Sequence, residues 1–78
     1  MDAALKTLKI TVNGQPRSLE GIGSPASLKS VLETLGLRAD RIAVELNGEI
    51  APRTLWDERT VADGDRIEIV HFVGGGRR

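Results

Sequence analysis

The sequence predicts an α+β domain in which a single helix covers one face of a mixed sheet of four to five strands. Three observations carry this prediction. Three segments alternate apolar and polar residues, one segment has apolar residues at helical spacing, and Asn-Gly occurs twice after an apolar run. A chain of 78 residues has room for one core of this kind and no second domain.

The first element is a predicted β-hairpin. Residues 8–12 alternate apolar and polar side chains, which is the period of a strand with one buried face. Asn13-Gly14 follows, and this pair favours a type I′ turn because both central positions of that turn need positive φ. We expect residues 15–20 to return as the second strand, with Leu19 on the inner face.

The next element is the predicted helix, over residues 27–35. Ser27 is placed to cap its N-terminus, because a serine hydroxyl accepts a hydrogen bond from an early backbone N–H. Gly36 fits the left-handed residue that commonly ends a helix. The apolar side chains that form one stripe along this segment are Leu28, Val31, Leu32 and Leu35.

The second half of the chain begins with another predicted hairpin. Residues 42–46 alternate as a third strand, and Asn47-Gly48 marks a second tight turn. Residues 49–51 form only a short strand, because Pro52 removes a backbone donor.

An irregular crossover then leads to the last strand. We expect Leu55 and Trp56 to anchor this crossover, with Trp56 in the core. Asp63 and Asp65 flank a turn glycine and are interpreted as turn residues. Residues 66–73 form the last strand.

This order of elements predicts a mixed sheet whose first and last strands are adjacent and parallel. One helix has to cover one sheet, because neither can hide its apolar face alone. The architecture is the β-grasp, which ubiquitin also has. We expect a β-grasp domain over residues 1–73 and a flexible glycine tail over residues 74–78, of which the last two are arginines.

Composition argues against several classes of function. Eleven basic and eleven acidic residues balance, and there is one Phe, one Trp and no Tyr, so stacking on nucleic acid is not expected. The chain has no cysteine and one histidine, which supports neither a metal site nor a nucleophilic catalytic set. We therefore expect no catalytic residue and no bound cofactor. No apolar run is long enough to span a membrane, and we expect a cytoplasmic protein.

The last strand also carries a candidate docking surface. Ile67 and Ile69 are expected to point inward, which puts Val70 and Phe72 on the face that the helix does not cover. Exposed apolar side chains beside a chain terminus would form a docking patch. His71 falls on the helix-covered side and is expected to be partly buried.

Three glycines, Gly74, Gly75 and Gly76, directly follow this strand. Without Cβ atoms, a glycine run passes through a slot too narrow for any side chain. Such a tail suggests a terminus that is inserted into the active site of another protein. A frayed chain end is the alternative.

Together these features resemble the bacterial sulfur-carrier proteins of thiamine (thiazole) biosynthesis, a ubiquitin-like β-grasp family. The resemblance runs from about Leu8 to Gly76. It is carried by residues 12–14 (VNG), 27–32 (SLKSVL), 43–50 (AVELNGEI), 52–53 (PR), Trp56, 61–69 (VADGDRIEI) and above all 70–76 (VHFVGGG).

The resemblance implies a function without catalytic side chains. In this family a ubiquitin-activating-like enzyme uses ATP to adenylate the terminal glycine carboxylate, which by register is that of Gly76. Sulfur drawn from cysteine through a desulfurase relay then converts it to a thiocarboxylate. The carrier delivers this sulfur to thiazole synthase.

One feature departs from the family pattern, because Arg77 and Arg78 follow Gly76. The family ends at the second glycine of its Gly-Gly, so we expect a protease to remove both arginines before activation. Three alternatives stay open: a carrier for molybdopterin or another sulfur-containing metabolite, a protein modifier like ubiquitin, and a plain interaction domain.

Overall fold

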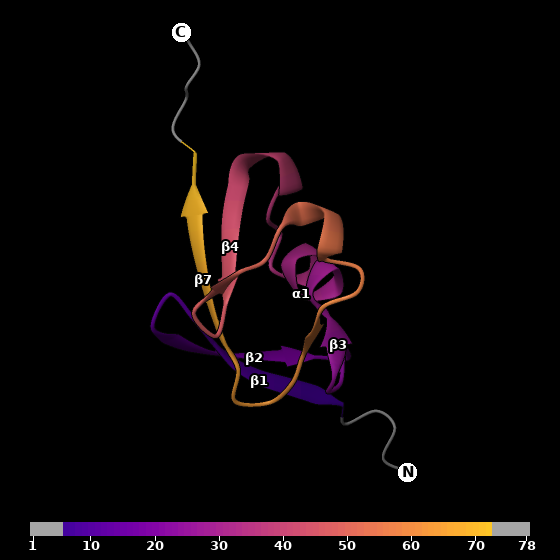
Figure 1. Ribbon diagram of the computed structural model, residues 1–78. Coiled ribbons are helices and arrows are strands. Elements are labelled where there is room, and N and C mark those ends of the chain that lie inside the picture. Colours follow the sequence, from indigo (N-terminus) through magenta and orange to yellow (C-terminus); the bar gives the residue numbers. More distant parts are fainter. Residues whose placement is uncertain (1–5, 73–78) are drawn as a thin grey trace, which may run out of the picture.

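The computed structural model describes residues 6–72, and its elements are arranged as two small sheets around one helix (Figure 1). In chain order they are β1 (Thr7–Val12), β2 (Gln15–Glu20), β3 (Ala26–Ser27), α1 (Leu28–Thr34), the 3₁₀ turn η2 (Ala39–Arg41), β4 (Ile42–Leu46), β5 (Glu49–Ile50), the 3₁₀ turn η3 (Arg53–Leu55), β6 (Thr60–Val61) and β7 (Arg66–His71).

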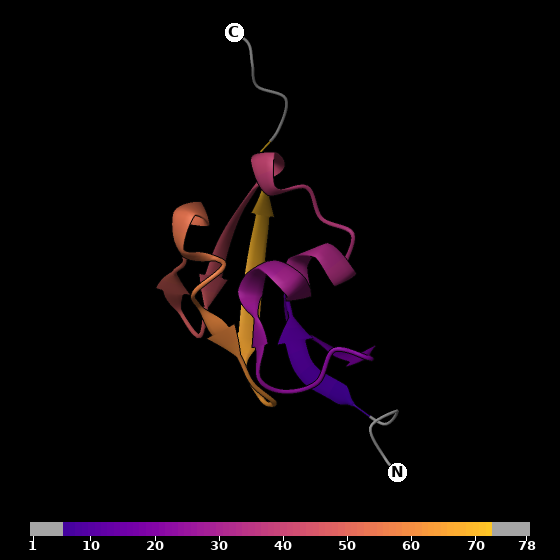
Figure 2. The ribbon, with the colours of Figure 1, turned by 90° about the vertical axis from the view of Figure 1, so that its right-hand side faces the viewer.

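The main sheet has five strands in the order β2-β1-β7-β4-β5. The first and last strands pair in parallel, with Thr11 opposite Arg66 and Val12 opposite Ile67. All other neighbours in this sheet are antiparallel. The predicted mixed sheet is therefore confirmed at five strands, and α1 crosses one of its faces while the other stays uncovered (Figure 2).

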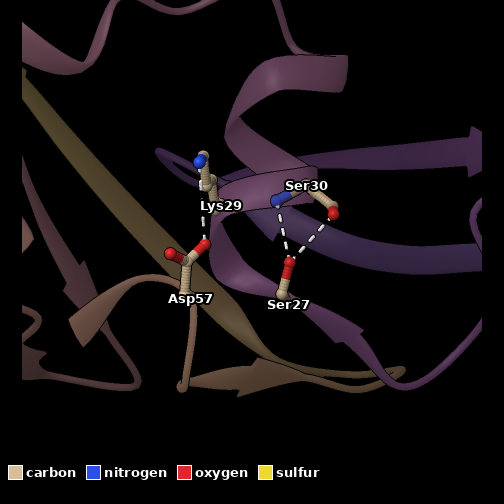
Figure 3. A network of polar contacts seen from close by, with 4 residues as sticks. All are labelled: Ser27, Lys29, Ser30 and Asp57. Atoms are coloured by element: carbon tan, nitrogen blue, oxygen red, sulfur yellow. Dashed lines mark hydrogen bonds and ion pairs between the residues drawn. The ribbon is translucent and has the colours of Figure 1, made fainter. Parts of the chain in front are cut away.

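The helix is one residue shorter at each end than the predicted segment, but its two caps are as predicted. The Oγ of Ser27 accepts a hydrogen bond from the backbone N–H of Ser30 at 3.0 Å (Figure 3). Gly36 has φ +79°. Its N–H and that of Leu37 donate to the carbonyls of Glu33 and Leu32, which is a Schellman motif.

The two Asn-Gly turns have the predicted positive φ at all four positions, and both asparagines have a second role. The Oδ1 of Asn13 accepts from the N–H of Ile69 at 2.7 Å, and its Nδ2 donates to the Ile69 carbonyl at 3.3 Å. The Oδ1 of Asn47 accepts from the N–H of Arg66 at 2.9 Å. Both hairpin turns therefore hold the terminal strand β7 in place.

We expect the variant Asn13→Gly to lower the free energy of unfolding by about 1–3 kcal/mol, because glycine keeps the turn but leaves a part-buried backbone N–H and C=O unpaired. The matched variant Asn47→Gly removes one exposed hydrogen bond and should cost less, about 0.5–1 kcal/mol. Urea denaturation of both variants measures the difference. Equal losses would contradict a special role for Asn13.

The core lies between α1 and the covered face of the sheet. Trp56 is in it as predicted, 4% exposed, and its indole N–H donates to the Ala51 carbonyl at 2.7 Å. Leu55 ends the 3₁₀ turn of this crossover but is 38% exposed and is not part of the core. The buried apolar residues are Leu8, Ile10, Val12, Leu19, Leu28, Val31, Leu32, Ile42, Val44, Leu46, Ala51, Trp56, Val61, Ile67 and Ile69.

The sequence did not predict the second sheet, in which β3 and β6 pair in antiparallel fashion. Each strand has two residues, too few to show a period. The turn after β6 is as predicted, since Asp63 and Asp65 both accept backbone hydrogen bonds. Asp63 accepts from the N–H of Lys9 and Asp65 from the N–H of Ala62, each at 2.9 Å.

Candidate functional site

The strand β7 is the element that leads toward the glycine tail, and its two faces differ sharply. Ile67 is fully buried and Ile69 is 7% exposed, whereas Val70 is 63% and Phe72 59% exposed. The alternation of a β-strand gives this result because successive side chains point to opposite faces. Both side chains are exposed as predicted, and the pairing of β7 with β4 places Val70 on the uncovered face.

A third exposed apolar side chain extends this surface. Ile50 on β5 is 73% exposed, and it lies opposite Glu45 of β4, while Ala43 of β4 lies opposite Val70 of β7. We call Ala43, Ile50 and Val70 the open-face patch. Together with Val44, Glu45 and Glu68 they line a hollow of about 180 Å³.

The exposure of Ile50 was not predicted, although the position of Ile50 relative to the Asn47-Gly48 turn indicates the face on which it lies. Residues that face each other across the Asn47-Gly48 turn share one side of the sheet. Counting outward from that turn would have placed Ile50 beside Glu45, on the side away from the core.

The prediction for His71 is wrong, because this histidine is exposed. It has the parity of the buried Ile67 and Ile69 and lies opposite the buried Ile42, but it is the last residue of β7, where the strand ends. With Phe72 it borders an open hollow at the end of the strand, on the side of the loop after α1. The other residues of this hollow are Gly36, Leu37, Arg38 and Arg41.

The predicted chemistry-bearing residues, Gly74, Gly75 and Gly76, lie outside the described residues, as do Arg77 and Arg78. Phe72 is the last described residue before the glycine tail. The N–H of Phe72 donates to the carbonyl of Arg41 at 2.9 Å, so β7 is still paired with β4 there. Gly76 is four residues further, which allows a reach of at most about 14 Å.

Elsewhere in the described part of the chain, no group of three or more His, Cys, Asp or Glu side chains is placed to hold a metal ion. Within residues 6–72 there is also no buried polar or charged side chain. No helix among these residues is both long enough and apolar enough to cross a membrane.

Comparison with known proteins agrees with this geometry. A family model described as the ThiS family matches residues 10–76, from the middle of β1 to the third glycine of the tail. The chain belongs to the ThiS family.

ThiS relatives agree over most of the chain. It is 39% identical over 67 residues to the sulfur carrier protein ThiS of Thermus thermophilus, covering 86% of this chain and 98% of that protein. The crystal structure of the thiamine biosynthesis protein ThiS from Geobacter metallireducens superposes with a TM-score of 0.76 at 38% identity, covering 88% of this chain and all of that one. The predicted β-grasp fold is confirmed by this structural match.

A second kind of relative is much longer. The chain is 36% identical over 69 residues to a thiazole synthase of Paramagnetospirillum magneticum, where 88% of this chain corresponds to only 20% of that protein. A ThiS-like segment therefore forms about a fifth of this thiazole synthase.

Proposed function

We propose that this chain is a sulfur carrier in thiamine biosynthesis, that the carboxylate of Gly76 carries the sulfur, and that the chain itself is no enzyme. The observation that supports this most is the ThiS-family match, which extends through the glycine run and stops at Gly76. Relatives of similar length are named sulfur carrier proteins. A relative named thiazole synthase that contains a ThiS-like segment supports thiazole synthase as the acceptor.

The proposed chemistry takes place at a backbone group. An adenylating enzyme of the ubiquitin-activating type joins the Gly76 carboxylate to AMP from ATP and releases pyrophosphate. The terminal sulfur of a persulfide then attacks the acyl carbon and displaces AMP. A thiol cleaves the resulting acyl disulfide, which releases the thiocarboxylate and leaves the thiol and the sulfur donor joined as a disulfide. The sulfur comes from cysteine through a desulfurase relay. Because the reaction consumes ATP, we place it in the cytoplasm.

Gly74 and Gly75 keep the approach to this carboxylate free of side chains. The acyl carbon of Gly76 is joined to Arg77 by a peptide bond in this sequence, so the proposal requires hydrolysis of that bond first. Intact-mass measurement of the sulfur-loaded protein from its own cell tests this step. Retention of both arginines in the sulfur-loaded protein would rule out Gly76 as the residue whose carboxylate carries the sulfur.

The body of the domain supplies the docking that holds the tail in place. Val70 and Phe72 are exposed beside the point where the tail departs, and apolar side chains in such a position suit a protein interface. A docked body keeps the terminal glycine at a high effective concentration in the partner's active site. Val70 and Phe72 therefore serve as the docking surface for the adenylating enzyme and for thiazole synthase.

Incubation of the chain ending at Gly76 with ATP, its adenylating enzyme and sulfide tests the proposal. We expect a mass change equal to one exchange of oxygen for sulfur, located at the C-terminus by fragmentation. Conjugates with other proteins would instead indicate a modifier of the ubiquitin type. Sulfur loading that serves molybdopterin formation but not thiazole formation would indicate the other carrier function.

A further inference from the structure

The open sheet face holds a pair of carboxylates on neighbouring strands. Glu45 on β4 lies directly opposite Glu68 on β7, so their Cβ atoms are about 5 Å apart. Like charges at directly opposite positions of antiparallel strands destabilise a sheet. The free domain therefore loses stability by having two acidic residues here.

No ion pair in the described chain compensates these two charges. Within residues 6–72 neither carboxylate forms an ion pair, since the ion pairs there join Lys29 to Asp57, Arg38 to Asp40 and Arg59 to Glu49. Arg66 lies on the same strand and face as Glu68, two residues away, and takes part in none of them. Glu45 is half-buried, which raises the cost of leaving its charge unpaired.

The hollow between these carboxylates has an apolar lining. Glu45 and Glu68 border it together with Ala43, Ile50 and Val70, and Ile50 and Val70 are largely exposed. An arginine side chain matches this combination, because its apolar stem packs on aliphatic groups while its planar guanidinium donates to two carboxylate groups at once. A lysine has the charge but not the planar fork.

We propose that this hollow receives an arginine side chain from the partner that docks on the open sheet face, and that Glu45 and Glu68 select that partner by charge. The inference rests on the proposed function, because it takes the adenylating enzyme as the partner. It adds the chemistry of recognition: the partner presents a positive group surrounded by apolar side chains, at the place where β4 and β7 face each other.

The test measures the affinity of the full chain for the purified adenylating enzyme, without ATP, at low and at moderate salt. We expect Glu45→Gln and Glu68→Gln each to raise the Kd by about 10- to 100-fold and to flatten its salt dependence, because each leaves the partner's cation poorly paired. The matched control is Glu33→Gln, the same change on the exposed side of the helix, which should alter the Kd less than about threefold.

A second measurement separates recognition from folding. The double variant Glu45→Gln with Glu68→Gln should raise the melting temperature of the free chain by about 1–4 °C, because it removes a like-charge contact. A lower melting temperature would show that the pair serves the fold and would overturn the proposal. So would an unchanged Kd in both single variants.

Two other occupants of the hollow give distinct results, and either would overturn the proposal. If the double variant alters the melting temperature of the full chain but not of a chain ending at Gly76, the chain's own arginines occupy the hollow. If it abolishes self-association in sedimentation, a second copy does. Failure of the wild-type chain ending at Gly76 to gain sulfur would reject the proposed function, whereas normal loading with unchanged Kd in the variants rejects only this inference.

Discussion

A chain that ends at Gly74 is expected to fold as the longer chain does but to gain no sulfur when incubated with ATP, the adenylating enzyme and sulfide. Removing Gly75 and Gly76 shortens the reach from Phe72 by about 7 Å. Catalysis depends on placing the reacting carboxylate within about an ångström, so we expect loading to fall by more than about a hundredfold. Intact mass spectrometry measures the loaded fraction.

The matched control is a chain that ends at Gly76, which has a free glycine carboxylate at the expected position. It should load fully, and the circular dichroism and melting temperature of the two chains should agree. The full-length chain, in which Gly76 is bonded to Arg77, should not load unless a protease is added. Sulfur gained by the chain ending at Gly74 would place the chemistry at another group.

The second large effect is expected from truncating a buried side chain of β7, with an exposed side chain of the same strand as the control. Ile67 is fully buried in β7, and Ile67→Ala should lower the free energy of unfolding by about 2–5 kcal/mol through lost burial and a residual cavity. A core of this size supplies only about 3–5 kcal/mol, so a large fraction of this variant should be unfolded. Thermal or urea denaturation followed by circular dichroism measures the loss.

Val70→Ala is the matched variant, because Val70 lies three residues further along the same strand and is 63% exposed. Like Ile67→Ala, it replaces a β-branched residue of β7 by alanine, but it opens no cavity. It should therefore lower the free energy of unfolding by less than about 1 kcal/mol. We expect it to weaken binding to the adenylating enzyme instead. A large loss of stability with unchanged binding would show that Val70 serves the fold and not the interface.

Much of the fold could be predicted from local patterns. The strands and the helix follow from apolar spacing, and both tight turns follow from Asn-Gly, because positive φ is a local requirement. The open orientation of Val70 and Phe72 follows from strand parity. The role of the tail glycines as the site comes from the glycine run and the family resemblance and stays a prediction, because these residues lie outside the described part of the chain.

Other features could not be read in this way, because they depend on residues far apart in the chain. Asn13 contacts Ile69, which is 56 residues away. The short strands β3 and β6 exist only because each pairs with the other. His71 has the parity of a core residue, but it is exposed at the last position of β7.

By itself the sequence determined the helix, the long strands with their faces, and the glycine run, since these depend on side-chain period and on the freedom of backbone without Cβ atoms. Only the tertiary structure decided that Glu45 lies opposite Glu68 and that Ala43 lies opposite Val70. The physical reason is strand register. Register brings residues more than 20 positions apart to within a few ångströms, and it is fixed by the packing of the whole core.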